Sequence, residues 1–294
     1  YSWERLRLSR KSKTSRAIRG SIYKIYSQSH EMKKPPLGQN YLIDEDIASE
    51  IIDQTGVSNN QHVLEIGPGK GILSALILKN AKSLTAIEID PKLCMILSNR
   101  FKQYENFQLL QADALKYNYS ALKNQYQVVS NLPYYAAAHI LKRLIHYREY
   151  FTHLTVMLQK EVVDRLVASP GTRNYGSLSV FVQFYCEVER LIEVDKDAFS
   201  PKPKIDSSVI KLTPRVTQRV QVDNLKTFFS VVNISFLHKR KILKNNLTGW
   251  KSLYQKRNDK TELAGINLNR RAETLSIEEF AILSNYINSN GDRI

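Results

Sequence analysis

The chain has 294 residues, of which 43% are hydrophobic and 24% are charged, a balance typical of a soluble globular protein with a sizeable core. Its apolar runs are far shorter than the roughly 20 residues of a membrane-spanning helix, which excludes that class. Two cysteines, Cys94 and Cys186, and six histidines without ligand spacing exclude a disulfide framework, and no metal site is predicted. The net charge of +15 indicates a polyanionic partner or an anionic surface.

Basic residues are concentrated in the first 34 positions. This segment holds ten Lys or Arg against Glu4 and Glu31. Its composition is typical of an organellar transit peptide or of a flexible arm that binds nucleic acid, and a leader upstream of Met32 is the third interpretation. We therefore expect a basic extension over residues 1–34. A cytoplasmic location is predicted, with a mitochondrion or plastid as the alternative if residues 1–31 are a transit peptide.

From Pro35 onward, apolar runs of strand length alternate with amphipathic stretches. This alternation predicts an α/β fold, a parallel sheet with helices on both faces. Pro91 suits the first turn of a helix. The expected strands are residues 62–66, 83–90, 107–113, 126–132, 153–159, 178–194 and 207–215, and the expected helices are residues 71–80, 91–104 and 137–147.

After Pro214 the pattern becomes helical and basic. Residues 225–247 and 274–287 have helical spacing, and Ser276 with Glu279 forms a capping box at the start of the second segment. We therefore expect two domains after the N-terminal extension, one over residues 35–216 and a smaller helical domain over residues 217–294.

Glycines and acids stand where the first strands end. Gly67, Gly69 and Gly71 follow the first strand in a G-x-G-x-G spacing, which departs from the dinucleotide fingerprint and lets the backbone approach a ligand closely. Glu88 ends the second strand, placed to bind both ribose hydroxyls of an adenosine, and Asp113 ends the third, placed to accept from the adenine amine. Glu65 makes this pocket more acidic, so the predicted cofactor is S-adenosylmethionine, whose sulfonium and ammonium groups are positive.

Further motifs along most of the chain support the prediction of an S-adenosylmethionine-binding protein. They are GQNYL at 38–42, VLEIGPGKGIL, IEID, QADAL, SNLPYY, MLQKEVVDRLVASPGTRNYGSLSV, AFSPKPKIDSSVIKL and HKRKILKNNL. From about Lys34 to its C-terminus the chain resembles the KsgA-type ribosomal RNA adenine dimethyltransferases. The resemblance implies a Rossmann-like S-adenosylmethionine-dependent methyltransferase domain followed by a small C-terminal helical domain. It also implies that the cofactor binds at Asn40, Leu42, Gly67, Glu88, Asp113 and Asn131. Gly69, in the same glycine loop, is expected to bind it as well.

The SNLPYY motif fits methylation of an adenine amine, whose lone pair is delocalised into the ring. We expect the Asn131 side chain and the Leu132 carbonyl, held by the stiff Pro133, to accept the two amine protons and leave the nitrogen nucleophilic. Tyr134 and Phe199 are expected to stack on the two faces of the extruded base. Core packing is the alternative for both rings. Residues 136–138 are all alanine, where the family more often has isoleucine followed by hydroxyl residues.

RNA binding is expected outside the pocket, at Lys202, Lys204, Lys239, Arg240 and Lys241. The predicted partner is small-subunit ribosomal RNA in an immature subunit, bound by a monomer. Residues 170–180, PGTRNYGSLSV, favour that substrate, because relatives that methylate large-subunit RNA generally lack this stretch. Large-subunit methylation stays open, as does a non-catalytic role in ribosome assembly or mitochondrial transcription.

Overall fold

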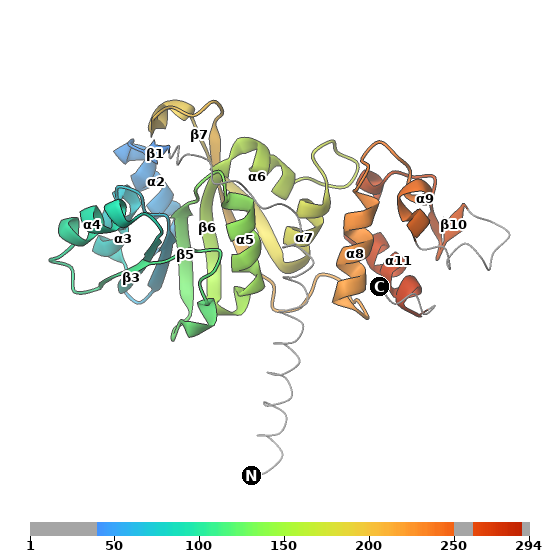
Figure 1. Cartoon of the computed structure of the whole chain (residues 1–294), viewed down its shortest axis with the longest axis horizontal. Coiled ribbons are helices and arrows are strands. Elements are labelled where there is room, and N and C mark those ends of the chain that lie inside the picture. The colour runs from blue at the N-terminus through green and yellow to red at the C-terminus, as the bar shows by residue number, and fades with distance from the viewer. Residues whose placement is uncertain (1–39, 250–260, 290–294) are drawn as a thin grey trace, which may run out of the picture. The chain divides into compact units, whose positions relative to one another are not determined.

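The computed structural model describes residues 40–249 and 261–289 (Figure 1). The expected extension at 1–34 lies outside these residues. The chain divides into two compact units, one spanning Gly38–Arg219 and the other including Val220–Ile294. The predicted domain boundary near residue 217 lies close to this division and stays a prediction. Among the residues described, no helix is both long and apolar enough to cross a membrane.

A seven-stranded sheet forms the centre of the first unit, with strand order β4-β3-β2-β5-β6-β9-β7. The first five strands in this order are parallel, and β9 is antiparallel to both β6 and β7. This arrangement confirms the predicted α/β fold class. The strands are β2 (His62–Ile66), β3 (Ser83–Glu88), β4 (Phe107–Gln111), β5 (Tyr126–Asn131), β6 (Phe151–Gln159), β7 (Cys186–Val194) and β9 (Ser207–Pro214).

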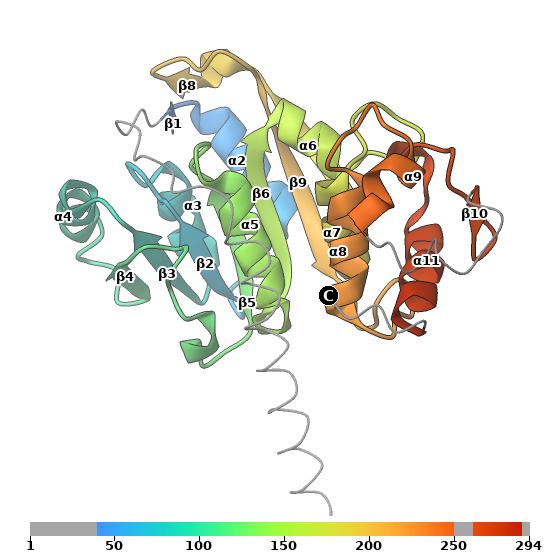
Figure 2. The same ribbon diagram turned by 45° about the vertical axis from the view of Figure 1, so that its right-hand side comes forward.

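Helices cover the sheet because their apolar positions recur with helical spacing. The buried side chains of α2 (Glu45–Thr55), α3 (Ile72–Asn80) and α4 (Pro91–Arg100) form one cluster with residues of β2, β5, β6 and β9. Asp44 and Asp90 cap α2 and α4 by accepting backbone N–H groups. Figures 1 and 2 show α5 (Ala137–His146) lying against β5 and β6. It contacts α7 (Ser177–Tyr185), which in turn packs on α6 (Lys160–Leu166).

The predicted strand at 178–194 is wrong in its first half, where α7 runs to Tyr185 and β7 begins at Cys186. A short apolar run reads alike as a buried strand or a buried helix. Two polar side chains, one helical turn apart, favour the helix because both reach backbone carbonyls at the end of α6. The Ser179 hydroxyl donates to the Arg165 carbonyl at 2.5 Å, and the Gln183 amide donates to the Leu166 carbonyl at 3.0 Å.

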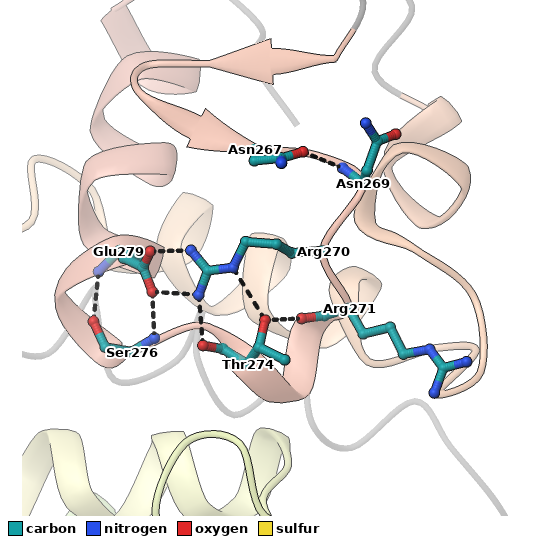
Figure 3. A network of polar contacts seen from close by, with 7 residues as sticks. All are labelled: Asn267, Asn269, Arg270, Arg271, Thr274, Ser276 and Glu279. Atoms are coloured by element: carbon teal, nitrogen blue, oxygen red, sulfur yellow. Dashed lines mark hydrogen bonds and ion pairs between the residues drawn. The ribbon is translucent and has the colours of Figure 1, made fainter.

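In the second unit, α8 (Leu225–Ser235) packs against α11 (Ile277–Ser289). The predicted helix at 225–247 is wrong beyond Ser235, because a turn separates α8 from the short α9 (Leu243–Asn246). The Asn246 amide stabilises this break by donating to the Ser235 carbonyl at 2.7 Å. The predicted capping box is confirmed, since Ser276 and Glu279 bond each other's backbone N–H at 3.1 and 2.9 Å (Figure 3). A hairpin of β10 (Glu262–Leu263) and β11 (Ile266–Asn267) precedes α11.

Candidate active site

The carboxyl ends of the parallel strands meet at one edge of the sheet, where α/β proteins bind ligands. Ile66 pairs with Ile87 in β3, and Glu88 pairs with Gln111 in β4. The glycine loop follows β2, Glu88 ends β3, Asp113 lies two residues after β4, and Asn131 ends β5. The structure therefore brings the residues predicted from these four strands to the same edge.

The glycine loop between β2 and α3 is packed closely. Gly67 and Gly69 have φ values of 66° and 60°, in the left-handed region that favours glycine. A Cβ atom on Gly69 would lie 3.0 Å from Cδ1 of Tyr41, and one on Gly67 would lie 3.4 Å from Cδ of Pro133. The loop backbone thus lies directly against the predicted site residue Pro133.

Glu88 has one oxygen engaged and the other available. The side chain is 2% exposed, and Oε1 accepts the backbone N–H groups of Ile89 and Asp90 at 2.8 and 2.9 Å. Oε2 is buried and has no partner of good hydrogen-bond geometry among the residues described, although the Gly69 backbone N–H lies near enough to the carboxyl to lower its pKa. Burial raises the pKa of this carboxyl, and the backbone N–H groups oppose that rise. An unpaired buried acceptor is costly, and the hydroxyls of a cofactor ribose fit it.

The other two acids of the predicted pocket have protein partners. Glu65 is 1% exposed and accepts the Ser74 hydroxyl at 2.6 Å, and burial raises its pKa to about 8. Asp113 accepts the backbone N–H of Leu115 at 2.8 Å, and its side chain is 29% exposed. Asp113 therefore stays open to a ligand, whereas Glu65 belongs to the buried wall behind the glycine loop.

The SNLPYY motif carries a second unsatisfied acceptor. Asn131 is paired with Met157 at the end of β5, and its Oδ1 is buried without a hydrogen-bond partner within the described part of the chain. The Leu132 N–H donates to the Met157 carbonyl at 3.2 Å, and the Pro133 carbonyl accepts from the N–H of Ala136 at 3.0 Å. These backbone bonds hold the motif rigid while the Asn131 amide oxygen remains available.

The rings of Tyr134 and Phe199 meet edge to face, with centroids 6.3 Å apart. The Tyr134 hydroxyl bonds the Ser207 hydroxyl at 2.6 Å, and burial raises the pKa of this phenol. Phe199 is 3% exposed and belongs to the core cluster beneath α2 and α3. It therefore packs here against the side of Tyr134, and its predicted contact with the base stays a prediction.

Two short paired strands place the end of the motif at residues 38–42 beside Phe199. In β1 (Tyr41–Leu42) and β8 (Phe199–Ser200), Leu42 pairs with Phe199, next to the half-buried Asn40. Sequence reasoning missed Tyr135, which is 39% exposed. Its pKa is raised by burial and then by the nearby charges of Glu88 and Asp113, so the phenol lies on the predicted cofactor side. Its position directly after Tyr134 was the available signal.

The predicted RNA-binding residues fall in separate places. In the first unit, Lys202 forms an ion pair with Asp197, and Lys204 is exposed. In the second unit, the exposed Lys239, Arg240 and Lys241 occupy the turn between α8 and α9.

Arg271 is a further basic residue that the sequence did not single out. It is exposed, and it forms an isolated β-bridge with Ile242, directly after the basic turn. Figure 3 shows its side chain pointing away from the neighbouring network, in which Arg270 bonds both Glu279 and Thr274. Because Arg271 is distant in sequence from the turn, only the fold brings these cations together.

Known proteins resemble this chain in sequence and in fold. The family model for ribosomal RNA adenine dimethylase matches residues 30–289. The ribosomal RNA small subunit methyltransferase A of Clostridium botulinum is 44% identical over 254 residues, covering 85% of this chain and 92% of that protein. A dimethyladenosine transferase from Plasmodium falciparum has 25% identity and a TM-score of 0.69, covering 85% of this chain and 98% of that one. The 23S rRNA methyltransferase ErmE has the same fold, with 22% identity and a TM-score of 0.64 over 85% of this chain and all of that one. The chain therefore belongs to the ribosomal RNA adenine dimethylase family.

Proposed function

We propose that this protein dimethylates the exocyclic amines of two adjacent adenosines in a small-subunit ribosomal RNA loop during ribosome maturation. The observation that carries the proposal is the Asn131 amide oxygen, which is buried without a partner among the described residues at the carboxyl edge of the sheet. An adenine amine supplies the donor that this acceptor lacks. Glu88 Oε2, a buried acceptor without a partner of good geometry among the described residues, lies at the same edge and is assigned to the ribose.

Binding of the cofactor is assigned to the residues around the glycine loop. S-adenosylmethionine supplies an electrophilic methyl group when bound. Glu88 would hold its ribose, Asp113 its adenine amine, and the backbone of Gly67 and Gly69 would approach it closely. Asn40 and Leu42 are assigned to the same site by the family motif.

Activation of the target amine needs no strong base. Asn131 Oδ1 and the Leu132 carbonyl would each accept one amine proton, so that the nitrogen lone pair is directed at the methyl group. The amine proton passes to solvent after each transfer. Tyr134 offers a ring on which the extruded base regains lost stacking, and its bond to Ser207 fixes the ring's orientation.

The substrate assignment is supported by residues 170–180, which relatives acting on large-subunit RNA generally lack. These residues include the fully buried Tyr175 and lead into α7. The available Glu88 and Asn131 acceptors favour a catalytic enzyme over a binding factor on the same fold, because binding RNA phosphates requires neither. Phosphate contacts are assigned to Lys202, Lys204, the basic turn at 239–241 and Arg271.

The test is transfer of labelled methyl groups to immature small subunits isolated from cells that lack the modification. We expect the label in two adjacent N6,N6-dimethyladenosines, located by nuclease digestion and mass spectrometry and by primer-extension stops. Label confined to large-subunit RNA would establish the alternative substrate. RNA binding with no transfer to either subunit would establish the assembly-factor role.

We further propose that the protein acts as a monomer in the cytoplasm, with an organelle as the alternative location. Sedimentation of the protein with and without RNA tests the first statement, and a dimer at micromolar concentration would contradict it. Imaging of the tagged full-length protein tests the second.

A further inference from the structure

The adjacent strands β2 and β5 stop pairing with each other before they reach the candidate active site. Their last register pair joins Leu64 to Val128. Beyond that point β2 stays paired with β3 as far as Ile66, and β5 stays paired with β6 as far as Asn131. The carboxyl edge of the sheet is therefore divided, with the glycine loop on the β2 side and Asn131 on the β5 side.

A serine hydroxyl crosses this division. Ser130 Oγ donates to the carbonyl oxygen of Ile66 at 2.5 Å, and both residues are 2% exposed. This distance lies within the range of O–H···O hydrogen bonds. The residue after Ile66 is Gly67, and the residue after Ser130 is Asn131. One buried bond thus joins the two chain positions from which the glycine loop and the amine-binding motif begin.

A second contact spans the same division slightly further out. Pro133 lies against Gly67, where an added Cβ would be 3.4 Å from the proline Cδ. Gly67 is also held on its other side, since its N–H donates to the Ile87 carbonyl at 2.9 Å. The start of the loop is therefore located by three neighbours, of which Ser130 alone acts through a side-chain hydrogen bond to Ile66.

We propose that Ser130 is a positioning residue that sets the distance between the glycine loop and Asn131. Its buried hydroxyl acts through the Ile66 carbonyl. The inference rests on the proposed function, because in-line methyl transfer requires the cofactor and the target amine to be held together closely. A displacement of about 1 Å between reacting groups can cost roughly 100-fold in rate, and a bond of this kind limits such displacement.

The experiment compares Ser130→Ala with Ser130→Thr, which keeps the hydroxyl, and with Ser208→Ala as the matched control. Ser208 is a fully buried serine of the same sheet whose hydroxyl has no partner among the described residues. Hydrogen exchange of the peptide covering residues 66–73 is measured without ligand. Calorimetry with S-adenosylhomocysteine and single-turnover methyl transfer at saturating cofactor and RNA follow.

For Ser130→Ala we expect faster exchange at residues 67–71 and a fall in single-turnover rate of about ten-fold, while RNA affinity is unchanged. Ser208→Ala is expected to match the wild type, and Ser130→Thr, which adds a methyl group at a 2% exposed position, is expected to keep exchange and rate closer to the wild type than Ser130→Ala does. Wild-type exchange and rate in Ser130→Ala would overturn the proposal, as would a lower Tm with an unchanged rate. If the wild type itself transfers no methyl group, the proposed function fails. Exchange and S-adenosylhomocysteine affinity then decide on Ser130, and unchanged values in Ser130→Ala overturn its role.

Discussion

Replacing Glu88 with glutamine is expected to weaken S-adenosylmethionine binding without unfolding the protein. Glutamine has the same size, and its oxygen can still accept the N–H groups of Ile89 and Asp90, which Oε1 now accepts at 2.8 and 2.9 Å. Its NH₂ group would then replace Oε2, the buried acceptor that has no partner of good geometry among the described residues. A donor at that position cannot accept the ribose hydroxyls.

The loss can be estimated from the bond that disappears. A hydrogen bond to a charged group contributes about 1.5–3 kcal/mol, and each 1.4 kcal/mol is ten-fold in affinity. Loss of one such bond therefore predicts a Kd roughly 10- to 150-fold higher. The free energy of unfolding of the ligand-free protein should rise, because burial raises the pKa of Glu88. The folded state thus disfavours the carboxylate above its ordinary pKa, and an uncharged amide removes that cost.

Isothermal titration with S-adenosylmethionine at pH 8 measures the affinity, and denaturant unfolding of the ligand-free protein measures the stability. Asp90→Asn is the matched control, since it removes the same charge two residues away, from a side chain that caps α4 through the N–H of Lys92. Asparagine caps helices as well as aspartate does. A Kd for Glu88→Gln within two-fold of wild type would refute the assignment of this oxygen to the cofactor.

Three further outcomes are expected. Asn131→Ala should lower the single-turnover rate by about 100-fold or more with RNA affinity unchanged, and a wild-type rate would contradict its role in binding the amine. Alanine at all three basic positions of the 239–241 turn should weaken RNA binding and reduce the salt slope by roughly 2–3, whereas the exposed set Lys79, Lys82 and Lys102 should not. Glu65, with a pKa raised by burial from 4.5 to about 8, holds its proton more tightly in the folded state, so stability should fall as pH rises from about 4.5 to 8. Unfolding at pH 5 and pH 8 should show a fall on the order of 4 kcal/mol that Glu65→Gln lacks, and an equal fall in both proteins would contradict the reasoning.

The sequence by itself determined the parallel part of the sheet and which residues stand where its strands end. Strands β2 to β6 were predictable because their apolar runs have strand length and end in glycine, acid or amide residues. Their placement at a common edge could be predicted without knowing any contact between distant residues, because the carboxyl ends of parallel strands lie at the same edge of a sheet. The capping box at Ser276 was predictable for the same reason, because it depends on residues three positions apart.

Only the tertiary structure decided the features that depend on contacts between distant residues. Residues 177–185 became a helix because Ser179 and Gln183 bond carbonyls near the end of α6, and a buried helix and a buried strand share the same apolar run. Pairing of β1 with β8 placed Phe199 in the core beside Leu42. The unsatisfied oxygens of Glu88 and Asn131 and the Ser130 bond across the divided sheet follow from burial and strand order. The local sequence does not predict these unsatisfied oxygens or this hydrogen bond, because packing over the whole sheet decides which polar atoms find a partner.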